Sequence, residues 1–293
     1  MSEKLIKELE ETGDYRVVRR LKPVELYNTD DGEVKHIGIY LDVETTGLNS
    51  DTDKIIELAM IPFEYSDSGK IYRVLPDYTS YQDPGIPLPA ITTEITGITD
   101  EMIAGQAIDI KQVKALLSTA SIVIAHNARF DRGFMENFFD GFKDIAWGCS
   151  FADINWNEEG TGSLKLEYLA YEYGFFYDAH RATIDCQAGI EILSKTLPKS
   201  GTPVLKRLLE TAMTTNYRLW AVKSPFDKKD MLKQRGYRWS PGEGDTPKSW
   251  YIDLPENLLH DELEFLHNEL QMQAVEKLPM KKINATIRYS KRD

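Results

Sequence analysis

Apolar and polar positions alternate along the first third of the chain in a way that is typical of β-strands. Residues 3–12 have the spacing of a short amphipathic helix, and residues 14–26 then alternate like a strand. Mostly apolar runs follow, and the last two of them are separated by the turn sequence SDSG. The pattern therefore predicts an N-terminal helix and strand and then successive strands at residues 36–44, 54–65 and 70–78.

The middle of the chain shows helical spacing on both sides of one more strand. The apolar segment 121–126 predicts that strand, and a proline-rich loop precedes it at residues 83–90. Strands that alternate with helices indicate an α/β domain, and sheets of this kind place their sites at the carboxyl ends of strands. Helices are expected at residues 99–105, 109–120, 127–139, 163–174 and 181–197.

The final part of the chain, residues 213–293, predicts a small α+β domain. Its strand and helix signals follow in the order βαββαβ. The elements are expected at residues 216–223, 226–236, 237–240, 249–254, 257–271 and 283–290, with a turn at 241–247.

Basic and aromatic residues are interleaved within this last domain. A surface of that composition could hold single-stranded nucleic acid, because bases stack on aromatic rings and cations attract phosphates. The same residues could instead supply a small aromatic core with solvated basic groups around it, and the sequence leaves both interpretations open. The residues are Lys228, Lys229, Lys233, Arg235, Tyr237, Arg238, Trp239 and Trp250.

Composition indicates a globular chain of more than one domain, with 42% hydrophobic and 28% charged residues among 293. We divide it into an N-terminal helix and strand extension (1–36), an α/β domain (37–200) and an accessory domain (213–293). No apolar run is long enough to span a bilayer, and the charged start is unlike a signal peptide, so no membrane association is expected. Two cysteines cannot form a disulfide framework, which predicts a reducing, cytoplasmic location.

The net charge of −12 argues against a protein that coats duplex nucleic acid, since such proteins use surplus Lys and Arg to displace counterions. The charge is uneven along the chain. Residues 214–293 carry 14 basic and 12 acidic side chains, a balance of +2, so the acidic excess lies in the first 213 residues.

Two acids, Asp42 and Glu44, stand two positions apart at the end of the apolar run 36–44. On an extended strand, residues two apart project to the same face, so their carboxylates point together. Like charges held close repel, and a neutralising group is expected beside them. An isolated pair of this kind is usually only solvated or caps the next element.

Further acids are expected to converge on this pair. Asp131 follows the strand 121–126, and His180 and Asp185 lie at the start of the helix 181–197. Because each stands beside a strand end or on an early helical turn, the set predicts one acidic site.

Three ordered motifs, LDVETTGL, AHNARFDRGF and HRATIDCQAG, resemble those of the DEDDh (DnaQ-like) 3′→5′ exonucleases. The resemblance is greatest to the epsilon subunit of DNA polymerase III and its relatives, and it covers roughly residues 37–197. One departure is Thr96, where epsilon-type nucleases often have histidine. The positions that match the family's catalytic residues show no departure from its motifs.

The resemblance implies an RNase H-like mixed sheet flanked by helices, and removal of nucleoside 5′-monophosphates from single-stranded or frayed 3′ ends of DNA. By matched position, it implies that two Mg²⁺ or Mn²⁺ ions are held by Asp42, Glu44, Asp131 and Asp185, and that His180 is the general base. Phosphodiester chemistry agrees, because paired divalent ions stabilise an anionic substrate and hard oxygen ligands select such ions. An imidazole titrates near neutrality and can relay a proton.

Substrate contacts implied by the family come from the first two motifs. Core packing is an equal alternative for Leu48 and Phe130, although a stacked 3′ base also requires an apolar face. The implied contacts are Thr45, Thr46, Gly47, Leu48, His126, Asn127 and Phe130.

Two alternatives to a DNA exonuclease remain. One is an RNA-trimming enzyme like oligoribonuclease or ribonuclease T. The other is a noncatalytic nucleic-acid-binding subunit. The absence of one of the four carboxylates would favour this alternative, and all four are present. The partner is therefore a nucleic acid 3′ end, with DNA preferred over RNA. Proofreading, repair and turnover all fit, and no visible motif indicates a polymerase or repair partner.

Overall fold

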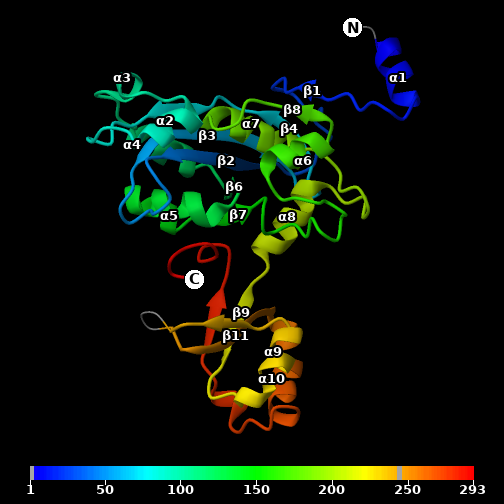
Figure 1. Ribbon diagram of the computed structural model, residues 1–293, viewed down its shortest axis with the longest axis vertical. Coiled ribbons are helices and arrows are strands. Elements are labelled where there is room, and N and C mark those ends of the chain that lie inside the picture. The colour runs from blue at the N-terminus through cyan, green and yellow to red at the C-terminus, as the bar shows by residue number, and fades with distance from the viewer. Residues whose placement is uncertain (1–2, 243–245) are drawn as a thin grey trace. The chain divides into compact units, whose positions relative to one another are not determined.

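The computed structural model describes residues 3–242 and 246–293 and divides the chain into two compact units (Figure 1). The first unit extends to Ala212 and also takes in Tyr289–Arg292 from the end of the chain. The second is Met213–Arg288 with Asp293. The predicted turn at 241–247 includes residues 243–245, which lie outside the described residues. Within the described part, no helix combines the length and apolar character that crossing a membrane requires.

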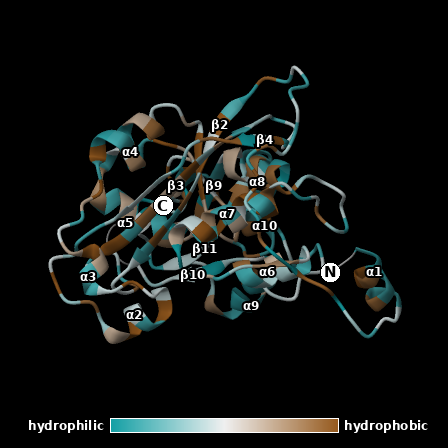
Figure 2. Cartoon of the chain, turned by 90° about the horizontal axis from the view of Figure 1, so that it is seen from above, coloured by the Kyte–Doolittle hydropathy of each residue, from teal (hydrophilic) through white to brown (hydrophobic). Residues whose placement is uncertain are grey.

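A six-stranded mixed sheet forms the centre of the first unit. Strand β2 is antiparallel to β3 and parallel to β6, which is parallel to β7, while β4 and β5 both pair with β3. Strand β3 is mostly hydrophobic (Figure 2). It is buried along nearly all of its length. The strands are β2 (His36–Thr45), β3 (Ile55–Tyr65), β4 (Ile71–Val74), β5 (Tyr78–Tyr81), β6 (Ile122–Ala125) and β7 (Trp147–Cys149). A separate parallel ladder joins β1 (Arg19–Arg20) to β8 (Phe175–Phe176).

Helices cover both faces of this sheet (Figure 1). Tyr40 packs with residues of α6, α7 and α8, whereas its neighbours Ile39 and Leu41 pack with residues of α4 and α5. Successive side chains of a strand point to opposite faces, so one strand supplies both cores. The predicted mixed sheet flanked by helices is confirmed. The helices are α1 (Glu3–Glu11), α2 (Ala90–Thr96), α3 (Asp100–Ile103), α4 (Ile110–Leu117), α5 (Ala128–Phe138), α6 (Leu166–Glu172), α7 (Ala182–Leu193) and α8 (Val204–Met213), with a 3₁₀ turn η1 (Asp140–Lys143).

Some expected elements differ in the structure. The strand predicted over 14–26 shrinks to β1, because most of this segment is exposed and only Arg19 and Arg20 form a ladder, while Leu26 makes an isolated bridge to Arg73. The strand predicted over 70–78 is two short strands, β4 and β5, separated at Pro76, whose nitrogen carries no hydrogen to donate to the ladder. The pattern did not predict α2, β7 or α8, of which α2 and β7 are short.

The second unit has the predicted βαββαβ order and a four-stranded antiparallel sheet in the order β10-β11-β9-β12. Leu219, Leu232, Leu254 and Leu266 lie in its core between sheet and helices. The elements are β9 (Asn216–Ala221), η2 (Phe226–Lys228), α9 (Lys229–Gln234), β10 (Arg238–Ser240), β11 (Ser249–Pro255), η3 (Glu256–Leu258), α10 (Leu259–Asn268), η4 (Val275–Lys277) and β12 (Met280–Ile283).

The prediction of a last strand over 283–290 is wrong, because β12 already ends at Ile283. Asn284 begins a turn: its side-chain oxygen accepts from the Thr286 amide at 3.1 Å, and its carbonyl accepts from the Arg288 amide at 2.8 Å. Local side-chain hydrogen bonds of this kind compete with a strand ladder. The residues beyond the turn, Tyr289–Arg292, therefore do not extend the sheet and belong to the first unit.

Candidate active site

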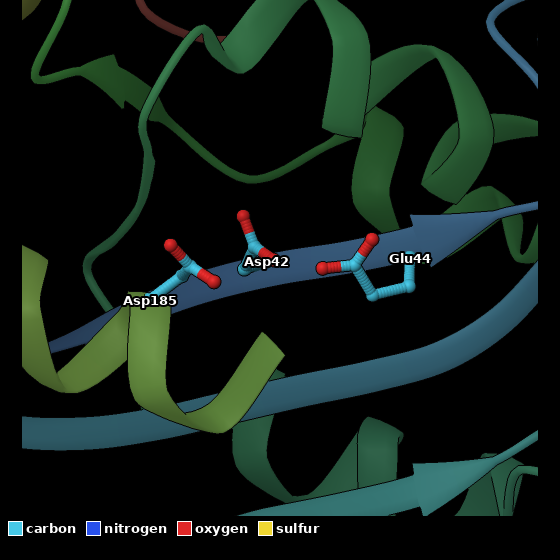
Figure 3. Close-up of side chains that lie close together, drawn as sticks. All are labelled: Asp42, Glu44 and Asp185. Atoms are coloured by element: carbon cyan, nitrogen blue, oxygen red, sulfur yellow. The ribbon is translucent and has the colours of Figure 1, made fainter. Parts of the chain in front are cut away.

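Three carboxylates converge at the end of β2 and the start of α7 (Figure 3). Asp42 and Glu44 project from the same side of β2, and Asp185 comes from the first turns of α7. One oxygen of each lies within 4.8 Å of an oxygen of the others. The β2–β3 pairing is irregular between Glu44 and Thr45, so the strand is distorted where the site begins.

Asp131 approaches the same place from the edge of the sheet. Strand β6 pairs with β2 only from Gly38 to Tyr40, so among the described residues no strand lies beside the later edge of β2 on that side. The buried Asp131 carboxylate takes that place and accepts from the Val43 amide at 3.2 Å. Its position on α5, directly after β6, follows from the strand-then-helix order of the second motif.

The pKa values of these acids are raised. Burial is the main cause for Asp42, and the charges of Asp131, Asp185 and Glu44 add to it, so its pKa lies well above the usual range. Burial, Asp185 and Glu57 raise the pKa of Glu44 to about 8. A group of carboxylates that disfavours its own ionisation is suited to binding cations, which would stabilise the ionised forms.

Burial likewise raises the pKa of Asp131 and of Asp185. For Asp185 a hydrogen bond from the Arg181 amide, at 3.1 Å, acts in the opposite direction, as does the nearby His180. The donors of this cluster are hard oxygens, which fit Mg²⁺ or Mn²⁺ rather than metals that prefer thiolates.

His180 lies in the turn that precedes α7. Its side chain is exposed, and its backbone has a left-handed φ of 68°, which residues other than glycine rarely adopt. This turn brings the imidazole near Asp185 while leaving it in contact with solvent. A group in that position can exchange protons with bulk water.

A fifth acid, Glu57, was missed by the sequence reasoning. It lies on β3 opposite Glu44 and is buried, with 1% of its side chain exposed. Its carboxylate accepts from Arg181 at 2.9 Å and from the Ala182 amide at 3.0 Å, so it caps α7 from the sheet and holds the turn that carries His180. The available signal was an acid, Glu57, with apolar residues on both sides of it inside the predicted strand 54–65.

The turn after the first motif is held by its own hydrogen bonds. Thr46 is buried and exchanges hydrogen bonds with Lys54 at 2.9 and 3.0 Å, and the Thr45 hydroxyl donates to the Gly47 carbonyl at 2.6 Å. A Cβ at Gly47 would lie 2.7 Å from the Asp53 carboxylate, which would have to shift from its hydrogen bond with the Asn49 amide. Leu48 is 86% exposed, which places it outside the core.

The residues of the second motif have different surroundings. His126 is held between Ser150, 2.9 Å from its Nδ1, and the Leu164 carbonyl, to which its Nε2 donates at 2.8 Å. Burial lowers the pKa of His126 to about 4, so the ring is neutral near pH 7. Asn127 is exposed with a left-handed φ of 66°, and Phe130 is half-buried against Phe134.

Leu48, Asn127 and Phe130 line one cavity of about 510 Å³. The structure thus brings together one predicted contact from the first motif and two from the second. Two residues that the sequence analysis did not single out, Tyr289 and Lys291, also line it.

Part of the basic and aromatic segment of the second unit has a structural role. Tyr237 is buried and donates to Glu262 at 2.9 Å, and Arg235 pairs with the same carboxylate at 2.9 Å. Trp250 packs against the core of this unit, whereas Trp239 is 50% exposed. Core packing therefore accounts for Tyr237 and Trp250.

Known proteins resemble this chain in sequence. The family model for exonucleases (RNase_T) matches residues 39–193, about half the chain. A DNA polymerase III PolC-type of Lacticaseibacillus paracasei is 36% identical over 164 residues, which are 51% of this chain and 10% of that protein. Another, from Halalkalibacterium halodurans, is 29% identical over 211 residues, which are 70% of this chain and 13% of that protein. The chain therefore spans about a tenth of the length of these curated relatives.

Solved structures resemble it in fold. Exonuclease I of E. coli, crystallised in complex with a dA16 oligonucleotide, matches with a TM-score of 0.51 and 17% sequence identity, over 83% of this chain and 75% of that one. The match agrees with the RNase H-like arrangement of a mixed sheet between helices. On the match to the family model and the converging acids of its ordered motifs, the chain belongs to the exonuclease (RNase_T) family.

Proposed function

We propose that the protein is a metal-dependent 3′→5′ exonuclease that removes nucleoside 5′-monophosphates from single-stranded or frayed 3′ ends of DNA. The observation that carries the proposal is the convergence of Asp42, Glu44 and Asp185 within 4.8 Å, with the buried Asp131 on the adjoining strand edge. These four carboxylates are hard oxygen ligands, which divalent ions prefer. Divalent ions held in this way assist the hydrolysis of phosphodiesters.

The four carboxylates would hold two Mg²⁺ or Mn²⁺ ions. Bound ions of this kind supply positive charge that stabilises the reacting phosphate and lowers the pKa of water. The chain itself contributes the orientation of the acids: β2 fixes two of them, α5 the third and α7 the fourth. Burial and mutual repulsion keep these groups poorly ionised until cations bind.

His180 acts as the general base in this proposal. It takes the proton of the attacking water and, because its side chain is exposed, releases that proton to solvent. Glu57 and Arg181 position it, since their ion pair and the bond to Ala182 fix the turn from which it projects.

DNA as substrate is supported by the relatives, which are named as DNA polymerases, and by the fold match to an exonuclease crystallised with a DNA oligonucleotide. These likenesses support the substrate class only, because the relatives are much longer than this chain.

The test is hydrolysis of matched 5′-labelled DNA and RNA oligonucleotides with Mg²⁺, Mn²⁺ or a chelator. We expect a ladder that shortens from the 3′ end, faster on DNA and absent in chelator. Asp42→Asn should lower the rate of hydrolysis by about 10³-fold or more, because a metal ligand is removed. Asp140→Asn, which changes an exposed acid outside the site, is the matched control. A folded wild-type chain that cleaves neither substrate would refute the proposal.

A further inference from the structure

The last residues of the chain are anchored on the first unit. Ser290 is fully buried and donates to Glu136 of α5 at 2.7 Å, and Arg292 donates to the same carboxylate at 2.9 Å and to the Lys143 carbonyl at 2.9 Å. Glu136 also pairs with the buried Arg132 at 2.7 Å. A buried carboxylate with several charged and polar partners is a firm attachment point. We call Tyr289–Arg292 the C-terminal tail.

Tyr289 provides the second anchor. Its hydroxyl donates to the buried Asp153 at 2.6 Å, and its ring packs against the core that lies under α5. The backbone of Tyr289 has a left-handed φ of 70°, a conformation that costs about 1 kcal/mol or more in a residue with a side chain. Such a backbone persists only where its surroundings determine it, so the anchors hold the tail in one conformation.

The anchored tail forms one wall of the cavity of about 510 Å³. The opposite walls come from the turn after the first motif, with Leu48, and from the start of α5, with Asn127 and Phe130. Phe130 directly precedes the acid Asp131 in the sequence. The cavity is within the size range of small-ligand sites, and it combines apolar side chains with a few polar ones.

Lys291 lies at this cavity with its side chain 49% exposed. It pairs with Asp51, which is itself 69% exposed. An ion pair between exposed groups contributes about 0–1 kcal/mol, so the ammonium can exchange this carboxylate for a phosphate with little loss. The neighbouring tail anchors keep Lys291 at the cavity whichever partner it has.

We propose that the C-terminal tail is part of the substrate site, in which Lys291 binds a backbone phosphate of the single-stranded substrate and Tyr289 forms a wall of the cavity that holds one of its nucleotides. The acidic character of the first unit gives a cation at this cavity a clear role, because a polyanionic strand must approach a negatively charged surface. Lys291 contributes affinity and orientation and takes no part in the chemical step. This inference rests on the proposed function.

The test measures binding apart from catalysis. A 5′-fluorescein-labelled single-stranded dT oligonucleotide is titrated in chelator, and its anisotropy is followed at several salt concentrations. We expect Lys291→Ala to weaken binding by about threefold to tenfold at low salt, and to reduce the slope of log Kd against log salt by about 0.7, the value for one phosphate contact on a single strand. Lys291→Arg should bind like the wild type, and Asp51→Asn should bind more tightly.

The matched control is Lys206→Ala on α8, which removes a lysine that is 44% exposed and similarly paired, to Glu210. It should leave both Kd and its salt slope unchanged. In turnover assays with metal, the effect of Lys291→Ala should fall on KM rather than on kcat, and Tyr289→Ala should raise KM more than Tyr289→Phe.

The outcomes separate this inference from the proposed function. If the wild type shortens DNA but Lys291→Ala binds like Lys206→Ala, the tail has only a structural role and the inference is overturned while the exonuclease stands. If the wild type neither binds nor shortens the oligonucleotide, the proposed function fails first. Circular dichroism of each variant excludes unfolding as the cause of a loss.

Discussion

Two buried carboxylates on the same helix, Asp131 and Glu136, have opposite environments. Burial is the largest influence on the pKa of each and favours the neutral acid in both. Around Glu136, hydrogen bonds from Ser290, Arg132 and Arg292 outweigh it, and the pKa of Glu136 is lowered. The fold thus provides the cationic and hydrogen-bonding partners that keep this carboxylate ionised.

Asp131 has a weaker set of compensating partners. The Val43 amide lowers its pKa, but Glu44 and Asp185 add further negative charge, and the pKa lies well above its usual range. The difference teaches how a structural acid can be told from a metal-binding one. Glu136 receives its cations from the chain, whereas in the proposed function the cluster around Asp131 receives them from solution.

The largest effect is expected at Asp131, the acid whose ionised form is disfavoured by burial and by neighbouring acids. Asp131→Asn keeps an acceptor for the Val43 amide but removes one charge from the cluster. Nuclease activity should fall by about 10³-fold or more, because the site loses a cation ligand. In chelator the variant should unfold at the same or a higher denaturant concentration than the wild type. Lower stability in chelator would contradict the view that burial and neighbouring acids disfavour the ionised form of Asp131 in the folded chain.

Removing the proposed general base, His180, should lower the activity nearly as much but leave cation binding intact. His180→Ala should lower kcat by about 10²–10⁴-fold, the usual contribution of a general base. Isothermal titration with Mn²⁺ should give the wild-type affinity, since the carboxylates are unchanged. An equal loss of Mn²⁺ affinity would assign His180 to the metal site instead.

Glu136, whose charge is offset by its partners in the fold, should show its effect in stability. Glu136→Gln removes the charge that faces Arg132, Ser290 and Arg292. The free energy of unfolding should fall by about 3 kcal/mol, as expected when one partner of a buried ion pair is lost. Urea denaturation in chelator measures it. A stability equal to the wild type would show that the cations around Glu136 are held by other groups.

A further effect should appear in the pH dependence of the metal-free protein. The pKa of Glu44 is about 8 in the folded chain, mainly through burial, and about 4.5 when unfolded. Between these values the folded state binds more protons, so the unfolding free energy contributed by Glu44 decreases as pH rises from about 4.5 to 8. Urea denaturation in chelator at pH 5 and pH 8 should show that the free energy of unfolding decreases less for Glu44→Gln than for the wild type. Added Mg²⁺ should stabilise the wild type more at pH 8 than at pH 5. A wild-type stability that rises over this range would contradict the assignment.

Much of the acidic site could be predicted from the sequence because its chemistry is local. Asp42 and Glu44 share a face for reasons of strand geometry alone, and the order of strand, turn and helix places Asp131 after β6. Glu57 could not be found in this way. Its neighbours Arg181 and Ala182 are more than a hundred positions away, and only the packing of α7 on β3 brings them together.

The C-terminal tail is a second feature that the local sequence pattern did not predict. The alternation of residues 283–290 predicts a strand, although Asn284 is of a type that is depleted in strands and favoured in turns, and it does turn the chain. Tertiary contacts decided the result, because the buried partners of Tyr289 and Ser290 outweigh an edge position in a small sheet.

By itself, the sequence determined the α/β class, the βαββαβ order of the second unit and the acids that define the family, since periodicity and motif spacing depend on nearby residues. Only the tertiary structure decided that the acids meet within 4.8 Å, that Glu57 supports them and that the tail lines the cavity. Those facts depend on which distant surfaces are buried against one another, and burial is a property of the whole fold.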